Sequence, residues 1–393
     1  MLSSTIKERL DGLRTPFYLY DMGLLERTLE QVTRHSSRYG YAVHYALKAN
    51  FEPRIFEYVR RFGLGVDCVS GNEVRYAIES GFPPSGIVYA GVGKSDAEME
   101  YGLRHDIFAF NCESRQEVGV LNGIAARMGK VANVALRINP DVDPESHRYI
   151  STGQADSKFG ISYREISELT AELGEMRNVR VSGLHFHIGS QIRNMAVFAK
   201  LCRRVNTLYE WFAAAGFSLG HINVGGGLGV NYEDPETEPI PDFATYFGTF
   251  HKNLRVGDCR VHFELGRSIV GQCGELVSRV LFTKTTAGGR NVAILDTSMT
   301  DLVRPALYQA RHSIENLDGA GRAAREYIIA GTACETSDIF RDEVTLPELR
   351  RGDLVAIKST GAYGSVMASR YNMHDIAPAV FSDTLVRASL RGL

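Results

Sequence analysis

The sequence alternates short apolar runs with helix-like stretches over its first two thirds, and this alternation limits the possible folds more than any other feature. Eight runs rich in branched and aromatic residues predict strands at 41–47, 65–69, 87–91, 107–111, 133–139, 181–187, 221–226 and 260–264. The stretches between them carry apolar residues at three- and four-residue spacing, which is typical of amphipathic helices, as at 53–62, 114–128, 163–176 and 197–216. Eight strands with helical crossovers form either a closed (β/α)8 barrel or an open doubly wound sheet.

The pattern changes near residue 275. Strand-like runs at 277–286, 291–297, 326–331 and 353–359 follow one another with few convincing helices between them. This predicts a second, mostly antiparallel β domain. The segment 15–21 is also strand-like and precedes the first αβ unit, so it fits this second domain better than the barrel. A length of 393 residues is likewise typical of two domains.

Charge and cysteine usage exclude several classes of protein. The 44 basic and 46 acidic residues give a net charge of −2, which argues against a nucleic-acid or membrane-surface protein. No apolar stretch approaches the roughly 18 residues of a membrane span, and the first residues lack an apolar signal core. The six cysteines have neither CxxC nor zinc-finger spacing. We therefore expect a cytoplasmic protein without disulfides or a zinc site.

Polar residues gather at the ends of the predicted barrel strands, where such barrels carry their working groups. They are Lys48, Asp67, Asn111, Arg137, Asn139, His185, His187, the glycines 225–227 and Glu264. A lysine inside a barrel is costly unless it is paired or deprotonated, although Lys48 could also be a solvated loop residue. The glycines can bring backbone amides against an anion.

Taken together, these groups fit one cofactor, pyridoxal 5'-phosphate. Lys48 would bind the cofactor aldehyde, the glycine loop would hold the phosphate, and Glu264 would hold the proton on the pyridine nitrogen. The His-Phe-His run at 185–187 lacks the further ligands that a metal needs, so we predict no metal site.

Seven motifs in family order resemble the alanine-racemase-like (fold-type III) pyridoxal phosphate decarboxylases. They are HYALKAN (44–50), GLHFHIGSQ (183–191), INVGGGLG (222–229), ELGRSIVG (264–271), DLVRPALYQ (301–309), CETSD (334–338) and GAYG (361–364). The resemblance covers nearly the whole chain. It implies a (β/α)8 barrel over 35–275 and a mostly antiparallel β domain built from 1–34 together with 276–393. The β domain would contribute to a homodimer and to the partner's active site.

The resemblance also implies roles for individual residues. Lys48 would hold the cofactor covalently, His187 would stack on its ring, and Glu264 would pair with its pyridine nitrogen. The phosphate would lie among Ser190, Gly225, Gly226, Gly227 and Arg267. Tyr363 would touch cofactor and substrate from the partner subunit's side, and Cys334, also from the partner, would be the proton donor.

Within this family the motifs are most similar to members that act on meso-2,6-diaminopimelate. That substrate has a second ammonium and a second carboxylate at its far end, and each buried charge must be matched. Glu335 fits the distal ammonium, and Arg304 with Tyr308 and Arg267 fits the distal carboxylate. The implied reaction is decarboxylation to L-lysine and CO2, the last step of lysine biosynthesis.

Two alternatives stay open. The nearer is a decarboxylase of the same fold for ornithine, lysine or a carrier- or siderophore-linked substrate; the more distant is a non-catalytic pyridoxal phosphate-binding protein. Single residues also allow plainer interpretations, with Arg304 in a surface ion pair, Tyr308 a core aromatic and Cys334 a small buried hydrophobe. The chain departs from the family pattern at Leu265, at Thr332 and in the run DTS at 296–298.

Overall fold

The computed structural model describes residues 10–143 and 158–385, and within these ranges eight parallel strands close into a barrel. The strands are β2 (Ala42–Ala46), β3 (Gly65–Cys68), β4 (Ile87–Tyr89), β5 (Ala109–Cys112), β6 (Ala132–Asn139), β8 (Val179–His185), β9 (His221–Asn223) and β10 (Arg260–Leu265). The barrel closes where β5 pairs with β6, and the short β7 (Ile161–Ser162) adds to the edge of β6. The sequence pattern allowed an open sheet as well, but the pairing of β5 with β6 shows that the sheet is a closed barrel.

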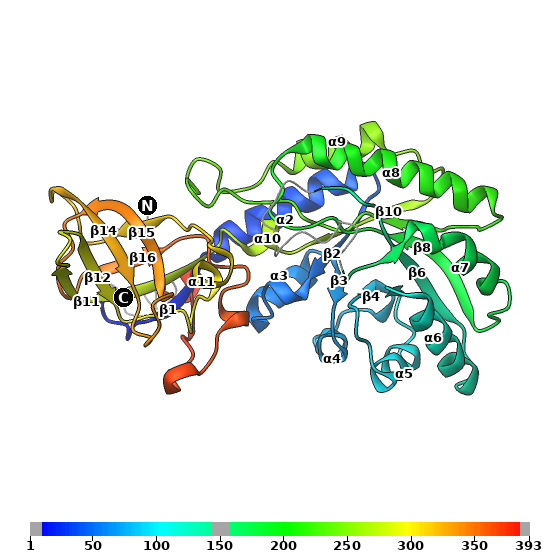
Figure 1. Cartoon of the computed structure of the whole chain (residues 1–393), viewed down its shortest axis with the longest axis horizontal. Helices are drawn as coiled ribbons and strands as arrows, with labels where there is room; N and C mark the ends of the chain where they lie inside the picture. The colour runs from blue at the N-terminus through cyan, green and yellow to red at the C-terminus, as the bar shows by residue number, and fades with distance from the viewer. Residues whose placement is uncertain (1–9, 144–157, 386–393) are drawn as a thin grey trace, which may run out of the picture.

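Helices cover the outside of the barrel, on the right in Figure 1. They are α2 (Met22–Ser37), α3 (Pro53–Arg61), α4 (Gly71–Glu79), α5 (Asp96–Arg104), α6 (Arg115–Arg127), α7 (Ile166–Leu173), α8 (Met195–Ala214), α9 (Phe243–Asn253) and the short α10 (Arg267–Val270). Local sequence sets several helix starts. Pro53 is the first residue of α3, and the Ser114 side chain accepts from the Glu117 amide to cap α6.

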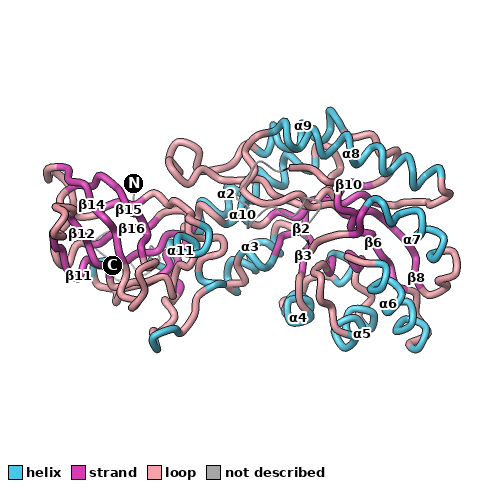
Figure 2. Tube along the Cα trace, in the orientation of Figure 1, coloured by secondary structure: helices cyan, strands magenta, loops and turns pink. Residues whose placement is uncertain are grey.

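Strands from both ends of the chain form the second sheet, on the left in Figures 1 and 2. They are β1 (Phe17–Tyr20), β11 (Gly274–Thr285), β12 (Asn291–Leu295), β13 (Ile314–Asn316), β14 (Ala324–Ala330), β15 (Ile339–Pro347), β16 (Leu354–Ile357) and β17 (Ala379–Phe381). The pairs β1–β17 and β12–β14 are parallel. The other five pairs are antiparallel, which confirms the expected mostly antiparallel sheet.

One long strand joins the two sheets. β11 begins directly after α10 and pairs with β1, so the long strand carries the chain from the barrel into the second sheet.

The border that we expected at residue 35 falls inside α2, which packs against β2 and α9. This amphipathic helix buries Leu25, Leu29 and Val32 on the barrel side, so the barrel unit begins with α2 and not after it.

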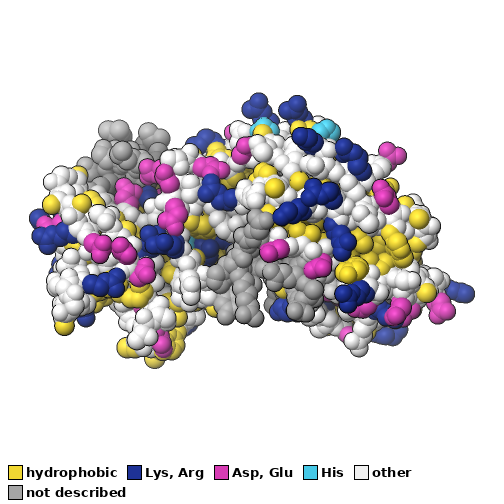
Figure 3. All heavy atoms as spheres, turned by 45° about the horizontal axis from the view of Figure 1, so that its top comes forward, with side chains coloured by type: hydrophobic (Ala, Val, Ile, Leu, Met, Phe, Trp, Pro, Cys, Tyr) yellow, Lys and Arg dark blue, Asp and Glu magenta, His cyan; other side chains and the backbone are white. Residues whose placement is uncertain are grey.

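The core of the barrel unit continues outward under α8 and α9. Phe263 of β10 meets Phe247 and Phe250 of α9 edge to face, with ring centroids 4.9 Å apart in both pairs. Within residues 10–143 and 158–385, none of the helices combines the length and the apolar character of a membrane span. The face drawn in Figure 3 mixes basic with acidic side chains.

Candidate active site

Lys48 lies in a single turn of 3-10 helix that directly follows β2, at the C-terminal end of the barrel. Its Nζ is 3.2 Å from Oδ2 of Asp67, a fully buried residue of β3, while 37% of the lysine side chain stays exposed. Desolvation opposes the charged amine, but Asp67, Tyr363 and Glu264 outweigh it and raise the pKa of Lys48 above its ordinary value. Lys48 is therefore a paired ammonium at the mouth of the barrel and not a freely solvated loop residue.

Glu264 ends β10, and three side chains hold its carboxylate from inside the barrel. Oε1 accepts hydrogen bonds from Asn111 over 3.0 Å and from Asn223 over 2.7 Å. Oε2 lies 3.0 Å from Nε2 of His185, which therefore donates. Burial would raise the pKa of Glu264, but the contact with His185 and the charge of Lys48 outweigh it and lower that pKa below its ordinary value. Glu264 is a fixed, ionised carboxylate.

The glycine run after β9 forms a close backbone cradle. A Cβ on Gly225 would lie 2.3 Å from the Phe186 carbonyl oxygen, and one on Gly226 would lie 1.8 Å from the Glu264 carbonyl oxygen. A Cβ on Gly227 would be 2.5 Å from the Gly189 carbonyl oxygen. Only glycine lets these strand ends approach so closely.

His187 borders this cradle. Its Nδ1 accepts a 3.2 Å hydrogen bond from the Gly226 amide, so this nitrogen carries no proton. Burial, with Arg137 and Lys48 nearby, lowers the pKa of His187 well below its ordinary value. The neutral ring matches the role of a flat surface beside a cofactor better than that of a cation. Its neighbour His185, also at this strand end, donates to Glu264.

Arg267 and Ser190 lie beside the glycine cradle and add a guanidinium and a hydroxyl to it. The Ser190 hydroxyl accepts from Nε and Nη2 of Arg267 over 3.2 and 3.0 Å. The Arg267 guanidinium lies 4.7 Å from the centre of the Tyr363 ring. Backbone amides, a hydroxyl and a guanidinium together suit a phosphate.

Tyr363 belongs to the same chain as Lys48, which corrects our expectation that it reaches the site from the partner's side. Its amide donates to the carbonyl of Ala49, the residue after Lys48, over 2.8 Å. Tyr363 has a positive φ of 56°, a conformation that turns the segment after β16 back onto the barrel mouth. The GAYG motif indicated the residue, but no pattern indicated which chain supplies it.

Beyond Arg267 lies a second buried guanidinium, that of Arg304 at the start of α11 (Arg304–Tyr308). Tyr232 links the two. Its hydroxyl accepts from Arg267 Nη1 over 2.5 Å, and its ring lies 4.6 Å from the Arg304 guanidinium carbon. Among the described residues no carboxylate forms an ion pair with either arginine, so the surface-ion-pair interpretation of Arg304 is wrong. Tyr308 is half-buried and lines, with Arg304 and Tyr232, a cavity of about 360 Å³.

Sequence reasoning missed Tyr232, and it missed His312 on the other side of Arg304. Tyr232 lies in the loop after the glycine run, and His312 lies in an irregular segment before β13. Neither position follows a strand or helix period, so no local signal marked them. A buried tyrosine between two arginines is visible only when the fold brings them together.

Cys334 and Glu335 lie apart from this cluster, on the exposed loop between β14 and β15. The Cys334 amide donates to Oδ1 of Asn372, and the Tyr371 hydroxyl donates to Glu335 over 2.5 Å. Within the described chain no hydrogen bond or ion pair joins either residue to Lys48 or Glu264. Cys334 is exposed, so it is not the buried hydrophobe that the residue type alone suggests.

Two of the departures from the family pattern contact each other in the segment that leads to Arg304. The Thr297 hydroxyl donates to Oδ2 of Asp301 over 2.8 Å, and the Thr332 amide donates to the Thr297 carbonyl over 3.1 Å. Thr297 and Ser298 are buried, and Leu265 is part of the core. The threonine contacts hold the turn that leads into α11, and none of the departures replaces a charged group of the site.

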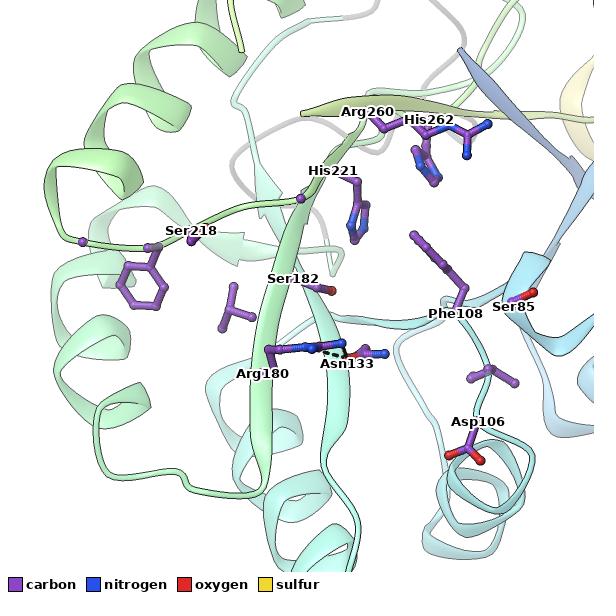
Figure 4. Close-up of a pocket in the computed structure, with 15 residues that line it drawn as sticks. Ser85, Asp106, Phe108, Asn133, Arg180, Ser182, Ser218, His221, Arg260 and His262 are labelled. Carbon is purple, nitrogen blue, oxygen red and sulfur yellow. Dashed lines mark hydrogen bonds between the residues drawn. The ribbon is translucent and has the colours of Figure 1, made fainter. Parts of the chain in front are cut away.

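A cavity of about 830 Å³ lies at the opposite, N-terminal end of the barrel strands. Figure 4 shows His221, His262 and Phe108 facing one another there. Burial, with neighbouring histidines, lowers the pKa of His221 to about 4 and that of His262 to about 2, so both rings are neutral. His262 also bonds to His44 over 2.9 Å. These packed rings close the bottom of the barrel, where stability and not chemistry is usual.

The residues at the C-terminal end fit pyridoxal phosphate. They supply an accessible lysine, an ionised carboxylate held from behind, a neutral ring, and a cradle of glycines beside Ser190 and Arg267 that a Cβ would fill. Fold and site together define a pyridoxal phosphate-dependent enzyme with a (β/α)8 barrel and a second β sheet.

Comparisons with known proteins also identify a pyridoxal-dependent enzyme. The family model described as "Pyridoxal-dependent decarboxylase, pyridoxal binding domain" matches residues 24–271. The diaminopimelate decarboxylase of Bacteroides thetaiotaomicron is 48% identical over 96% of this chain and 98% of its own length. That of Aquifex aeolicus is 38% identical over 96% of this chain and 88% of its own length. The crystal structure of the Helicobacter pylori enzyme complexed with L-lysine, 34% identical, matches 98% of this chain and 100% of its own with a TM-score of 0.89. The chain belongs to the diaminopimelate decarboxylases, within the fold-type III pyridoxal-dependent decarboxylases.

Proposed function

We propose that this chain decarboxylates meso-2,6-diaminopimelate at its D-configured centre and releases L-lysine and CO2, the last step of lysine biosynthesis. One observation carries the choice of substrate. Arg267 and Arg304 are buried cations without a carboxylate partner among the described residues, and they are linked through Tyr232. A buried guanidinium requires an anion, and the distal carboxylate of diaminopimelate supplies one.

The cofactor would be held by the groups that fit it. Lys48 binds its aldehyde, Gly225, Gly226, Gly227, Ser190 and Arg267 surround its phosphate, and Tyr363 lies over Arg267. When bound, pyridoxal phosphate supplies an electron sink for the electron pair that CO2 leaves behind. Glu264, held as a carboxylate, would keep the pyridine nitrogen protonated, and the neutral His187 ring would offer a flat surface to the cofactor.

The substrate groups would meet separate residues. Arg304, with Tyr308 and Arg267, binds the distal carboxylate, and Glu335 binds the distal ammonium. Cys334 then delivers the proton that replaces the departed carboxylate on the α-carbon. Lys48 recovers the cofactor as lysine leaves.

We further propose a homodimer in which Cys334 and Glu335 complete the partner's site. The support is the exposed position of both residues, together with the apolar surface beside them. Cys334 bonds to Asn372, whose neighbour Met373 is 95% exposed, and Tyr371 is also exposed. This segment belongs to the orange-red part of the chain that projects below the second sheet in Figure 1. Exposed apolar side chains next to an incomplete site favour a second copy of the chain as their cover.

The proposed dimer has two domains per chain, a barrel domain that begins with α2 and runs to about residue 275, and a β domain from both chain ends. The cytoplasm is the proposed location, because all six cysteines are unpaired, which suits a reducing compartment. The proposed partners do not include nucleic acid or membranes, in keeping with the balanced charge.

A substrate panel tests the proposal. The cofactor-loaded protein is incubated separately with meso-diaminopimelate, L-lysine, L-ornithine and L-arginine, and CO2 and amine products are measured. We expect L-lysine from diaminopimelate alone. Turnover of another amino acid without lysine formation would favour the nearer alternative. No turnover of any of them, with unchanged cofactor absorbance, would favour the non-catalytic one.

Arg304→Ala identifies the group that meets the distal carboxylate. We expect KM for diaminopimelate to rise about 100-fold, which is typical when a buried charge loses its partner. Arg311→Ala is the matched control, because Arg311 lines the same cavity but is exposed. An unchanged KM in Arg304→Ala would show that Arg304 does not bind the distal carboxylate.

A further inference from the structure

His312 is a buried histidine whose two ring nitrogens both have assigned partners. Nδ1 lies 2.8 Å from the Lys358 carbonyl oxygen, and Nε2 lies 2.8 Å from Nη1 of Arg304. A carbonyl only accepts, so Nδ1 carries the proton and Nε2 is a bare acceptor for the guanidinium. Burial and the charge of Arg304 lower the pKa of His312 well below its ordinary value, so the ring stays neutral.

The segment that carries His312 is held on both sides. The Ser313 amide donates to the Tyr232 carbonyl over 3.0 Å, and the Lys358 amide donates to the Ser313 carbonyl over 2.8 Å. These bonds extend the pairing of β13 with β16. The Tyr232 ring stands edge-on to the His312 ring, with centroids 4.9 Å apart. His312 therefore gives Arg304 a rigid support that is built from the second sheet.

The support is neutral, in contrast to the partner of another buried arginine. Arg137 is also buried, but its Nη1 is paired with the Glu113 carboxylate over 2.6 Å. Arg304 instead meets a neutral imidazole and a tyrosine ring, and its buried Nε has no hydrogen-bond partner in the described structure. The guanidinium is thus fixed in direction while its charge and one donor remain available to an anion.

We propose that His312 is the positioning residue that makes the site select substrates with a distal carboxylate. It acts through Arg304, which it orients without neutralising. This inference rests on the proposed function, in which Arg304 binds that carboxylate. A carboxylate at position 312 would hold Arg304 equally well but would cancel the charge that the substrate needs.

The test compares ligands that differ at the distal end, with His312→Leu and His312→Gln as variants. Leucine removes the acceptor, whereas the glutamine amide oxygen can replace Nε2. The ligands are meso-diaminopimelate as substrate, L-lysine as product inhibitor, and 1,5-diaminopentane, which has no carboxylate. In His312→Leu we expect KM for diaminopimelate and the lysine inhibition constant to rise together by about 10- to 100-fold, with kcat little changed. The inhibition constant of 1,5-diaminopentane should stay the same, and His312→Gln should restore most of the loss.

Two results would overturn the proposal. In one, His312→Leu leaves the constants for diaminopimelate and lysine unchanged. In the other, all three ligands weaken equally, which means a general structural role. Arg304→Ala is measured with the same three ligands, so that the role of Arg304 and the role of His312 are tested separately. If Arg304→Ala does not discriminate between the ligands, the proposed role of Arg304 fails; if it does but His312→Leu does not, only the role of His312 fails.

Discussion

Asn223 donates a hydrogen bond to Glu264 over 2.7 Å, from the end of one barrel strand to the end of the next. Asn111 and His185 approach the same carboxylate, so Glu264 has three donors before any cofactor is bound. Such pre-arranged donors keep the acid ionised in a buried place, where an isolated carboxylate would take up a proton.

Replacing the charge at this position should slow the chemistry and spare cofactor binding. In Glu264→Gln we expect kcat for CO2 release to fall by about 100- to 1,000-fold, because an amide does not stabilise a positive charge on the pyridine nitrogen. The cofactor should remain bound, as its absorbance will show. Glu79→Gln, on the exposed face of α4, is the control. A Glu264→Gln enzyme within threefold of the original kcat contradicts the assigned role.

The glycine cradle should not tolerate a methyl group. Gly226→Ala places a Cβ against the Glu264 carbonyl, so the strand ends must separate. We expect the free energy of unfolding to fall by about 1–3 kcal/mol, and cofactor affinity to fall with it, by titration of the apoprotein. Gly119→Ala in α6 has open space around its Cβ and should be neutral or slightly stabilising. Equal cofactor affinity in the two variants would contradict the cradle.

The histidines below the barrel should make stability depend on pH. The pKa of His221 is lowered to about 4 by burial and by His44, whereas an unfolded chain protonates its histidines near 6.5. Above about pH 6.5 this histidine is neutral in both states and costs no stability. As the pH falls from 6.5 towards 4, only the unfolded chain takes up the proton, so the free energy of unfolding decreases. We expect about 2 kcal/mol from this one group between pH 7 and pH 5.

Urea unfolding at several pH values measures that effect. His221→Asn cannot titrate, so its stability should fall less steeply between pH 7 and pH 5 than that of the original protein. His251→Asn, at an exposed site, should keep the original slope. If all three proteins lose stability in parallel, His221 is not the titrating group.

The barrel was predictable because parallel strands buried on both faces are written as continuous apolar runs. Each of the eight predicted strands overlaps an observed one. The second sheet was harder. β15 has an irregular pattern of buried and exposed residues and carries Arg341, Asp342 and Glu343, so no apolar run marks it. β13 and β17 have only three residues each, and they are strands because they pair with neighbouring strands, not because of a local sequence pattern.

The site divides in the same way. Lys48, the glycines and Glu264 were found because strand ends of a barrel converge by geometry, whatever the loops do. Tyr363, Tyr232 and His312 come from irregular segments that the second sheet folds back onto the barrel. Their positions depend on long-range contacts such as Tyr363 with Ala49 and His312 with Lys358, which no local period encodes. The contacts of His312 were therefore visible only in three dimensions.

A mixing experiment tests the complete account, with lysine release from meso-diaminopimelate as the measurement. Lys48→Ala and Cys334→Ala should each be nearly inactive alone. When they are mixed and allowed to exchange subunits, mixed dimers gain one intact site from the Lys48 of one chain and the Cys334 of the other. Lysine release should return to about one quarter of the original activity if subunits pair at random in a two-fold dimer. Cys259→Ala mixed with Lys48→Ala controls for the loss of a cysteine as such. A Lys48→Ala and Cys334→Ala mixture that exchanges subunits yet stays inactive would contradict a decarboxylase site completed by the partner.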